Sequence, residues 1–122
     1  MEALKHRLIT RTIKLANSSA AGITSPTIDV KGWTIVHGYY LLKIKDGGIT
    51  EAQTLVGLST GGIIIQEPTT VSHYLVGQNV GIDYRFCSNE FAITSPDLDI
   101  ALVTQANLTT DLEYQIILKV SK

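Results

Sequence analysis

The sequence contains a single cysteine and no apolar segment long enough to cross a membrane, and both absences exclude classes of protein. Cys87 has no second thiol with which to form an internal disulfide, and its strand-like surroundings predict a buried, small hydrophobic side chain. A bilayer requires about 20 consecutive apolar residues, so we expect no membrane span. Residues 1–16 alternate charged and apolar side chains without the apolar centre of a secretion signal. The absence of such a signal predicts a cytoplasmic location.

Charge is also scarce. Charged residues make up 17% of the chain, against about 25% in a typical soluble domain. Together with 44% hydrophobic residues, this suits a protein that covers part of its surface with neighbours, although a monomer with a Thr-, Ser-, Gln- and Asn-rich surface fits the same numbers. The formal net charge of −1 gives the whole molecule no strong field for nucleic acid.

Residues 1–16 form a basic N-terminal arm or first strand, with a local formal charge of +3. Its basic side chains are Lys5, Arg7, Arg11 and Lys14. Such a segment can make weak contacts with nucleic acid or with an acidic partner. The alternative is a first strand with four solvated charges, which the intervening apolar residues favour.

Sequence motifs for catalysis, metal binding or cofactor binding are missing. The chain has no nucleophile elbow, phosphate-binding loop or dinucleotide fingerprint. Its three histidines are too far apart in sequence for a metal-site motif, and they are His6, His37 and His73. We therefore expect a protein that is not an enzyme and that has no cofactor and no metal.

The chain is instead rich in short runs of β-branched residues. Ile, Val and Thr account for 37 of its 122 residues, and Gly, Pro, Asn and Asp separate the runs. No segment shows the apolar stripe of a core helix. The pattern predicts one domain over residues 1–122, an all-β, two-sheet antiparallel sandwich of jelly-roll-like type with eight to ten short strands.

Particular strands are predicted in more detail. Residues 33–45 are apolar on both faces, with a bulge expected at Gly38. Residues 112–120 place five apolar side chains on one face, which predicts a central strand. Strands are also expected over residues 7–15, 69–76 and 80–87, and residues 50–58 fit a short helix or a strand.

One short pattern occurs twice. Residues 23–30 and 93–100 share five identical positions, and in both copies a Ser-Pro pair precedes a strand with Asp on its outer face. The carboxylates of Asp29, Asp97 and Asp99 could bind Ca²⁺ if the two corners met, but ordinary turn capping is the favoured interpretation.

Several segments are candidates for contact with other molecules. Residues 63–65 are apolar on both faces, so we expect them to be covered on both sides. The candidate interface residues are Tyr39, Tyr40, Leu42, Ile63, Ile64 and Ile65. A second possibility is a sugar-stacking platform built from Trp33 with Tyr39 and Tyr74, although core packing is the favoured interpretation, because these residues lie among Ile and Leu without a polar cluster to hold a ligand.

Taken together, the pattern resembles the single jelly-roll and related β-sandwich proteins of virus capsids and virions. The features that carry the resemblance are the slightly basic first strand, the Ser/Ala/Gly/Pro-rich loop after it, the Thr-rich strands and the regular closing strand. The resemblance implies a structural coat protein that self-assembles into a homo-oligomer or larger assembly and contacts other virion proteins. The resemblance also implies a location in the virion. The alternatives are a tailed-phage decoration or tail component, a carbohydrate-binding module, and a small hydrolase or lyase on a β-scaffold, which would need a polar cluster that the sequence does not show.

Overall fold

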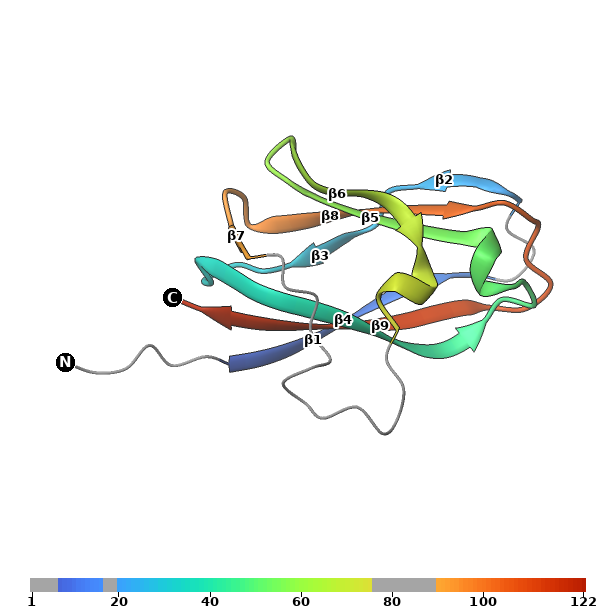
Figure 1. Ribbon diagram of the computed structural model, residues 1–122, viewed down its shortest axis with the longest axis horizontal. Coiled ribbons are helices and arrows are strands. Elements are labelled where there is room, and N and C mark those ends of the chain that lie inside the picture. The colour runs from blue at the N-terminus through green and yellow to red at the C-terminus, as the bar shows by residue number, and fades with distance from the viewer. Residues whose placement is uncertain (1–6, 17–19, 76–89) are drawn as a thin grey trace.

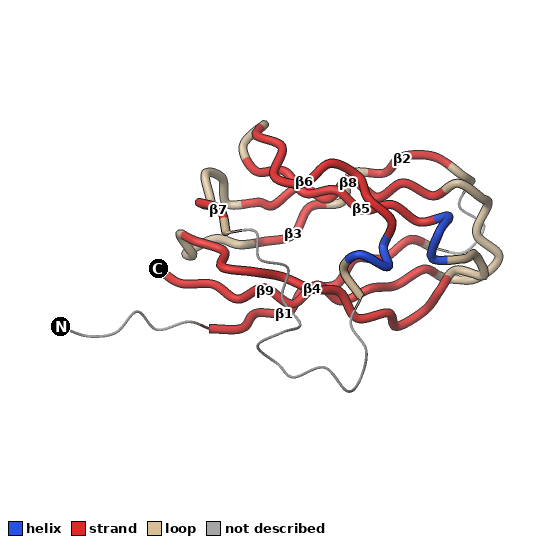
Figure 2. The backbone as a smooth tube through the Cα atoms, viewed as in Figure 1, coloured by secondary structure: helices blue, strands red, loops and turns tan. Residues whose placement is uncertain are grey.

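The computed structural model describes residues 7–16, 20–75 and 90–122, which form two antiparallel sheets packed face to face (Figures 1 and 2). Sheet A contains β1 (Arg7–Leu15), β4 (Ile35–Asp46), β7 (Phe91–Ala92) and β9 (Leu112–Ser121), in the order β1-β9-β4-β7. Sheet B contains β2 (Gly22–Thr24), β3 (Thr27–Asp29), β5 (Thr54–Thr60), β6 (Ile63–Thr70) and β8 (Asp97–Thr104). Its order is β2-β8-β5-β6, and β3 also pairs with β8. The predicted all-β, two-sheet antiparallel sandwich is confirmed.

The closing strand β9 lies in the middle of sheet A, as its pattern predicted. It pairs with β1 on one side and with β4 on the other. Its five alternate apolar side chains each expose at most 1% of their surface, and they are Leu112, Tyr114, Ile116, Leu118 and Val120. They face the alternate residues of β5 and β8 across the core, because successive side chains of a strand point to opposite sides of the sheet.

The long strand β4 contains the bulge expected near Gly38. Its pairing with β9 shifts register between Val36 and Gly38, and again between Lys43 and Lys45. Beyond Leu41 the strand leaves the core, and its last five residues are exposed. Gly47 and Gly48 then turn the chain with positive φ angles of 72° and 74°.

Two predictions for the middle of the chain need correction or completion. Residues 50–58 are neither one helix nor one strand, because a 3₁₀ turn over Glu51–Gln53 leads directly into β5.

The strand expected over residues 69–76 is wrong, since β6 continues to Thr70 and a second 3₁₀ turn occupies Val71–His73. This turn buries Val71 and brings the Tyr74 hydroxyl to the Val56 carbonyl, to which it donates at 2.8 Å. The strand expected over residues 80–87, like Cys87, lies outside the described residues.

The two copies of the repeated pattern pair with each other. Ile28 lies opposite Leu98, its counterpart in the other copy, in the antiparallel β3–β8 pair. The flanking hydrogen bonds match as well: Val30 N donates to Pro96 O and Ile100 N donates to Pro26 O, both at 2.8 Å. The two copies are thus related by a local pseudo-two-fold axis. Pro26 interrupts the edge strand between β2 and β3, a position at which a missing N–H is tolerated.

Candidate functional site

The apolar segment over residues 63–65 is open to solvent at the start of β6. Ile63 is 56% exposed and Ile64 is 67% exposed, so the expectation that both sides are covered does not hold within the single chain. The reason is position: Ile63 and Ile64 pair with Thr60 and Ser59 next to the turn of the β5–β6 hairpin, on the edge strand of sheet B. Only Ile65 is half-buried and packs against the core.

The other candidate interface residues lie on β4 and differ in exposure. Tyr39 is fully buried and packs against Tyr74 and Phe91, with ring centroids 5.9 and 6.2 Å away. Tyr40 points to the opposite face but is only 5% exposed. We expected both tyrosines to contact a partner, but the fold itself encloses them. Leu42, at 37% exposed, remains available.

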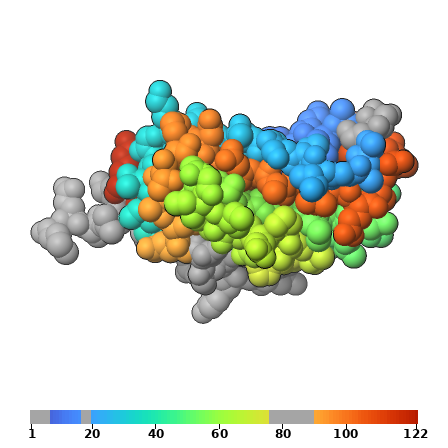
Figure 3. Space-filling view, turned by 90° about the horizontal axis from the view of Figure 1, so that it is seen from above, coloured from blue at the N-terminus to red at the C-terminus, as the bar shows by residue number. Residues whose placement is uncertain are grey.

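Further exposed apolar side chains accompany Leu42, Ile63 and Ile64. Among the described residues the large ones are Leu8, Ile23 and Ile44. Figure 3 looks onto the side of the molecule on which β2, β6 and β8 lie. Every one of these exposed residues belongs to a strand, so within residues 7–16, 20–75 and 90–122 the large exposed apolar side chains lie on the sheets.

The basic residues of the N-terminal segment do not form one site. Arg7 lies 5.6 Å from the Trp33 ring, and Arg11 Nε donates to the Asp29 carbonyl at 2.8 Å, which ties β1 to β3. Lys14 points to the opposite face of β1, where it lies across from Glu113. Lys5 lies outside the described residues. The alternation of the strand therefore places Lys14 on the opposite face of β1 from Arg7 and Arg11.

The tyrosines expected to form a sugar-stacking platform with Trp33 lie in the core. Tyr39 and Tyr74 are 0% and 1% exposed. Trp33 itself is half-buried, and Arg7 Cζ and Lys122 Nζ lie 5.6 and 5.5 Å from its ring centroid. Beside it is an open cleft of about 260 Å³, which is lined by residues 30–33 and 93–96. The described aromatic residues thus form no exposed row, and cations already contact the ring of Trp33.

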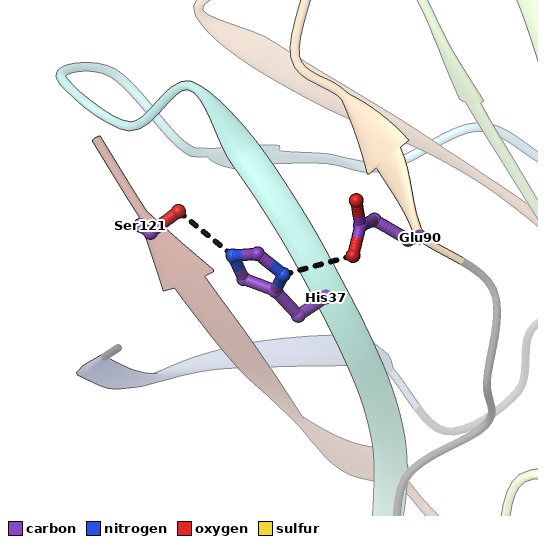
Figure 4. Close-up of polar contacts among 3 residues, drawn as sticks. All are labelled: His37, Glu90 and Ser121. Carbon is purple, nitrogen blue, oxygen red and sulfur yellow. Dashed lines mark hydrogen bonds and ion pairs between the residues drawn. The ribbon is translucent and has the colours of Figure 1, made fainter. Parts of the chain in front are cut away.

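A histidine joins three neighbouring segments of sheet A (Figure 4). His37 Nε2 lies 2.7 Å from Ser121 Oγ on β9, and His37 Nδ1 lies 3.0 Å from Glu90 Oε2, next to β7. The His37 side chain is 15% exposed, Glu90 is 64% exposed, and Ser121 is buried. Sequence reasoning considered His37 but missed Glu90 and Ser121, because only the register of the sheet places them on either side of it.

The order carboxylate, imidazole, hydroxyl matches that of hydrolase triads, but the surroundings do not support the same chemistry. A nucleophile must be reached by its substrate, and only 1% of Ser121 is exposed. The cleft beside Trp33 does not include Ser121, His37 or Glu90 in its lining. We therefore interpret the three residues as a cross-strand tie that joins β4 to β9 and to the start of β7.

The carboxylates proposed for Ca²⁺ do come together, although without the geometry of a metal site. Asp29 lies opposite Asp97 in the β3–β8 pair, and Asp99 is two residues further along β8. Asp29 Oδ1 accepts a hydrogen bond from Lys31 N at 2.8 Å, which is the capping role expected for this residue. Among the described residues, no group of three His, Cys, Asp or Glu side chains is arranged to hold a metal ion. His73 is exposed and packs edge-on against Tyr74, and His6 lies outside the described residues.

No helix in the described part of the chain is long and apolar enough to cross a membrane. No protein-family model, no curated protein and no solved structure matches the sequence or the fold.

Proposed function

We propose that this protein is a structural, self-assembling component of a virion, of the capsid or coat type. The observation that supports the proposal best is the set of large apolar side chains left exposed on the strands. Ile23 and Ile64 are 73% and 67% exposed on sheet B, and Leu8 and Ile44 are each 47% exposed on sheet A. A compact sandwich with apolar residues on both outer sides is suited to contact with further copies of itself.

The position of β6 adds a second argument. This strand lies at the edge of sheet B, and it begins with three consecutive isoleucines. Edge strands are usually protected by charge or by early prolines, because unpaired edges promote association. In β6 the first charged residue is Glu67, followed by Pro68, so the tip of the strand carries no such protection.

The test is the mass of the purified chain in solution. We expect sedimentation velocity to show concentration-dependent association, and electron microscopy of the same sample to show regular particles or shells. The variants Ile64→Asn and Leu42→Asn are expected to weaken association about tenfold or more each, because each removes an exposed apolar contact. Ala52→Asn, an exposed position in the 3₁₀ turn before β5, is the matched control and should assemble normally.

The form of the assembly distinguishes between the candidate functions. Open tubes or rings of fixed diameter would favour a tail or decoration component over a closed coat. A chain that stays monomeric at every accessible concentration would contradict the proposal.

A further inference from the structure

The two sheets carry opposite charges. The strands of sheet A hold six basic and two acidic side chains, a formal charge of +4. The strands of sheet B hold four acidic side chains and neither Lys nor Arg, a formal charge of −4. The basic residues are Arg7, Arg11, Lys14, Lys43, Lys45 and Lys119, and the acidic residues of sheet B are Asp29, Glu67, Asp97 and Asp99. The net charge of −1 for the whole chain conceals this separation.

Part of this charge lies on the outward-facing sides of the sandwich. Asp97 and Asp99 alternate along β8 with Leu98 and Ile100, which are buried in the core. On sheet A, Lys119 lies between the buried residues Leu118 and Val120 of β9, and therefore faces outward. Lys14 likewise points away from the core, because its neighbour Ile13 is buried.

Exposed apolar side chains lie on the same two outer faces. Leu8 lies across from Lys119, and Leu42 lies across from Gln115, on the outer face of sheet A. Ile23 lies across from Val103, and Ile64 across from Ser59, on the outer face of sheet B. Each face thus combines apolar contact area with charge. Asp29, Asp97 and Asp99 make the face of sheet B acidic, whereas Lys14 and Lys119 outnumber Glu113 on the face of sheet A.

The acidic face contains a local repulsion. Asp29 and Asp97 are direct cross-strand neighbours, and like charges in this position destabilise a strand pair. Asp97 and Asp99 make no ion pair with another described residue. A basic surface placed on this face would relieve the repulsion.

We propose that copies of this chain stack head to tail, with the exposed β1 side of the outer face of sheet A of one copy on the outer face of sheet B of the next. The middle of the sheet A face, where Tyr40 and Ile117 are each only 5% exposed, is already covered within the chain. This inference rests on the proposed self-assembly and specifies its geometry. The charges of the two faces are complementary, and every copy carries both. In such a contact the apolar residues supply most of the affinity, while the charges fix which faces meet. Because the two contacting surfaces differ, the contact is heterologous and repeats from copy to copy in one direction, so a closed coat requires further contacts besides this one.

Charge reversal on one face at a time tests this geometry. The sheet B variant is Asp97→Lys with Asp99→Lys, and the sheet A variant is Lys14→Glu with Lys119→Glu. The control is Lys31→Glu with Lys122→Glu, which gives the same change in net charge as the sheet A variant at exposed positions outside the strands. Each protein is first compared with the wild type by thermal unfolding, and its association is then measured by sedimentation velocity, alone and in equimolar mixture.

We expect each single-face variant to associate at least about tenfold more weakly than the wild type, and the control to associate normally. The mixture of the two variants should regain association, since the reversed sheet A face of one complements the reversed sheet B face of the other. Normal assembly of either single-face variant, or failure of the mixture to recover, would overturn the head-to-tail geometry while leaving self-assembly in place. Loss of binding to a nucleic acid in the sheet A variant, with no effect of the sheet B variant on assembly, would instead assign the basic face to a polyanion. A monomeric wild type would contradict the proposed function as well.

Discussion

Gly48 shows at the scale of one residue how the turn after β4 depends on glycine. Its φ angle of 74° lies in the left-handed region, and a Cβ built on it would collide with Thr109 Oγ1. Gly62, in the β5–β6 hairpin, has a similar φ angle of 84°, but a Cβ there would meet nothing within 4 Å. The two positions thus share the conformational strain and differ in the steric contact.

We predict that Gly48→Ala destabilises the protein more than Gly62→Ala. The strain of a left-handed alanine costs roughly 1–2 kcal/mol at either position, and overpacking against Thr109 adds about 1–3 kcal/mol at position 48 alone. Urea unfolding of both variants measures the two free energies. Equal losses at the two positions would show that Thr109 moves aside without cost.

Ionisation of the Tyr114 phenol makes the free energy of unfolding depend on pH in the alkaline range. Burial raises the pKa of its phenol above the usual 10.0, and the carboxylates of Glu51 and Asp46 add to the rise, while the Thr54 hydroxyl opposes it. Above pH 10 the unfolded chain releases this proton and the folded chain retains it. The free energy of unfolding therefore falls as the pH rises, by up to about 1.4 kcal/mol per pH unit from this group.

We predict that Tyr114→Phe makes the loss of stability above pH 10 less steep. Urea unfolding at intervals between pH 8 and pH 11 measures the slope for the wild type and the variant. Their difference in free energy should be constant below pH 9 and should shrink above pH 10. Parallel curves over the whole range would show that Tyr114 does not contribute.

At the scale of whole elements, the clearest contrast is between β9 and β2. β9 has a strand partner on each side and five enclosed apolar side chains, whereas β2 has three exposed residues at the edge of sheet B. Amides that are protected on both sides exchange only when a large part of the structure opens.

We predict that the amides of β9 exchange with solvent at least about a thousandfold more slowly than those of β2, equivalent to about 4 kcal/mol. Native-state hydrogen exchange followed by NMR gives the rates residue by residue. β4, which pairs with β9 over most of its length, is the internal comparison and should exchange slowly up to Leu41. Similar rates for β9 and β2 would be inconsistent with a central position for β9.

The elements also show where sequence patterns are sufficient and where they fail. β1 and β9 agree with prediction because each has one apolar face, and the alternation fixes which residues point inward. The segment after β6 was misjudged because its Thr, Val and Tyr residues are typical of strands, yet a 3₁₀ turn over Val71–His73 buries Val71 and the Tyr74 that follows it. An apolar residue in a short run indicates burial without specifying the local conformation.

At the scale of the whole molecule, the separation of charge between the sheets gives the sandwich an electric dipole that runs from one sheet to the other. The sheets differ by eight formal charges, from +4 on the strands of sheet A to −4 on those of sheet B. Opposed faces of stacked copies would attract at low salt. Exposed charges separated by more than the screening length no longer interact appreciably.

We predict that association of the wild type weakens about tenfold or more when the ionic strength rises from about 0.1 M to about 1 M, over which the screening length falls from roughly 10 Å to roughly 3 Å. Sedimentation velocity at a fixed protein concentration measures the change. The single-face charge variants should respond in the opposite direction, since salt screens repulsion in them. Association that strengthens with salt in the wild type would indicate a contact dominated by apolar surface.

The fold class, the central position of β9 and the bulge at Gly38 could be predicted from the sequence, because they depend on local alternation and on the conformational preferences of individual residues. The pairing of residues 23–30 with residues 93–100 and the placement of Glu90 and Ser121 around His37 could not be predicted. The separation of charge between the two sheets also became visible only in the folded chain. All three depend on which strands become neighbours, and strand order is set by contacts between segments that are distant in sequence.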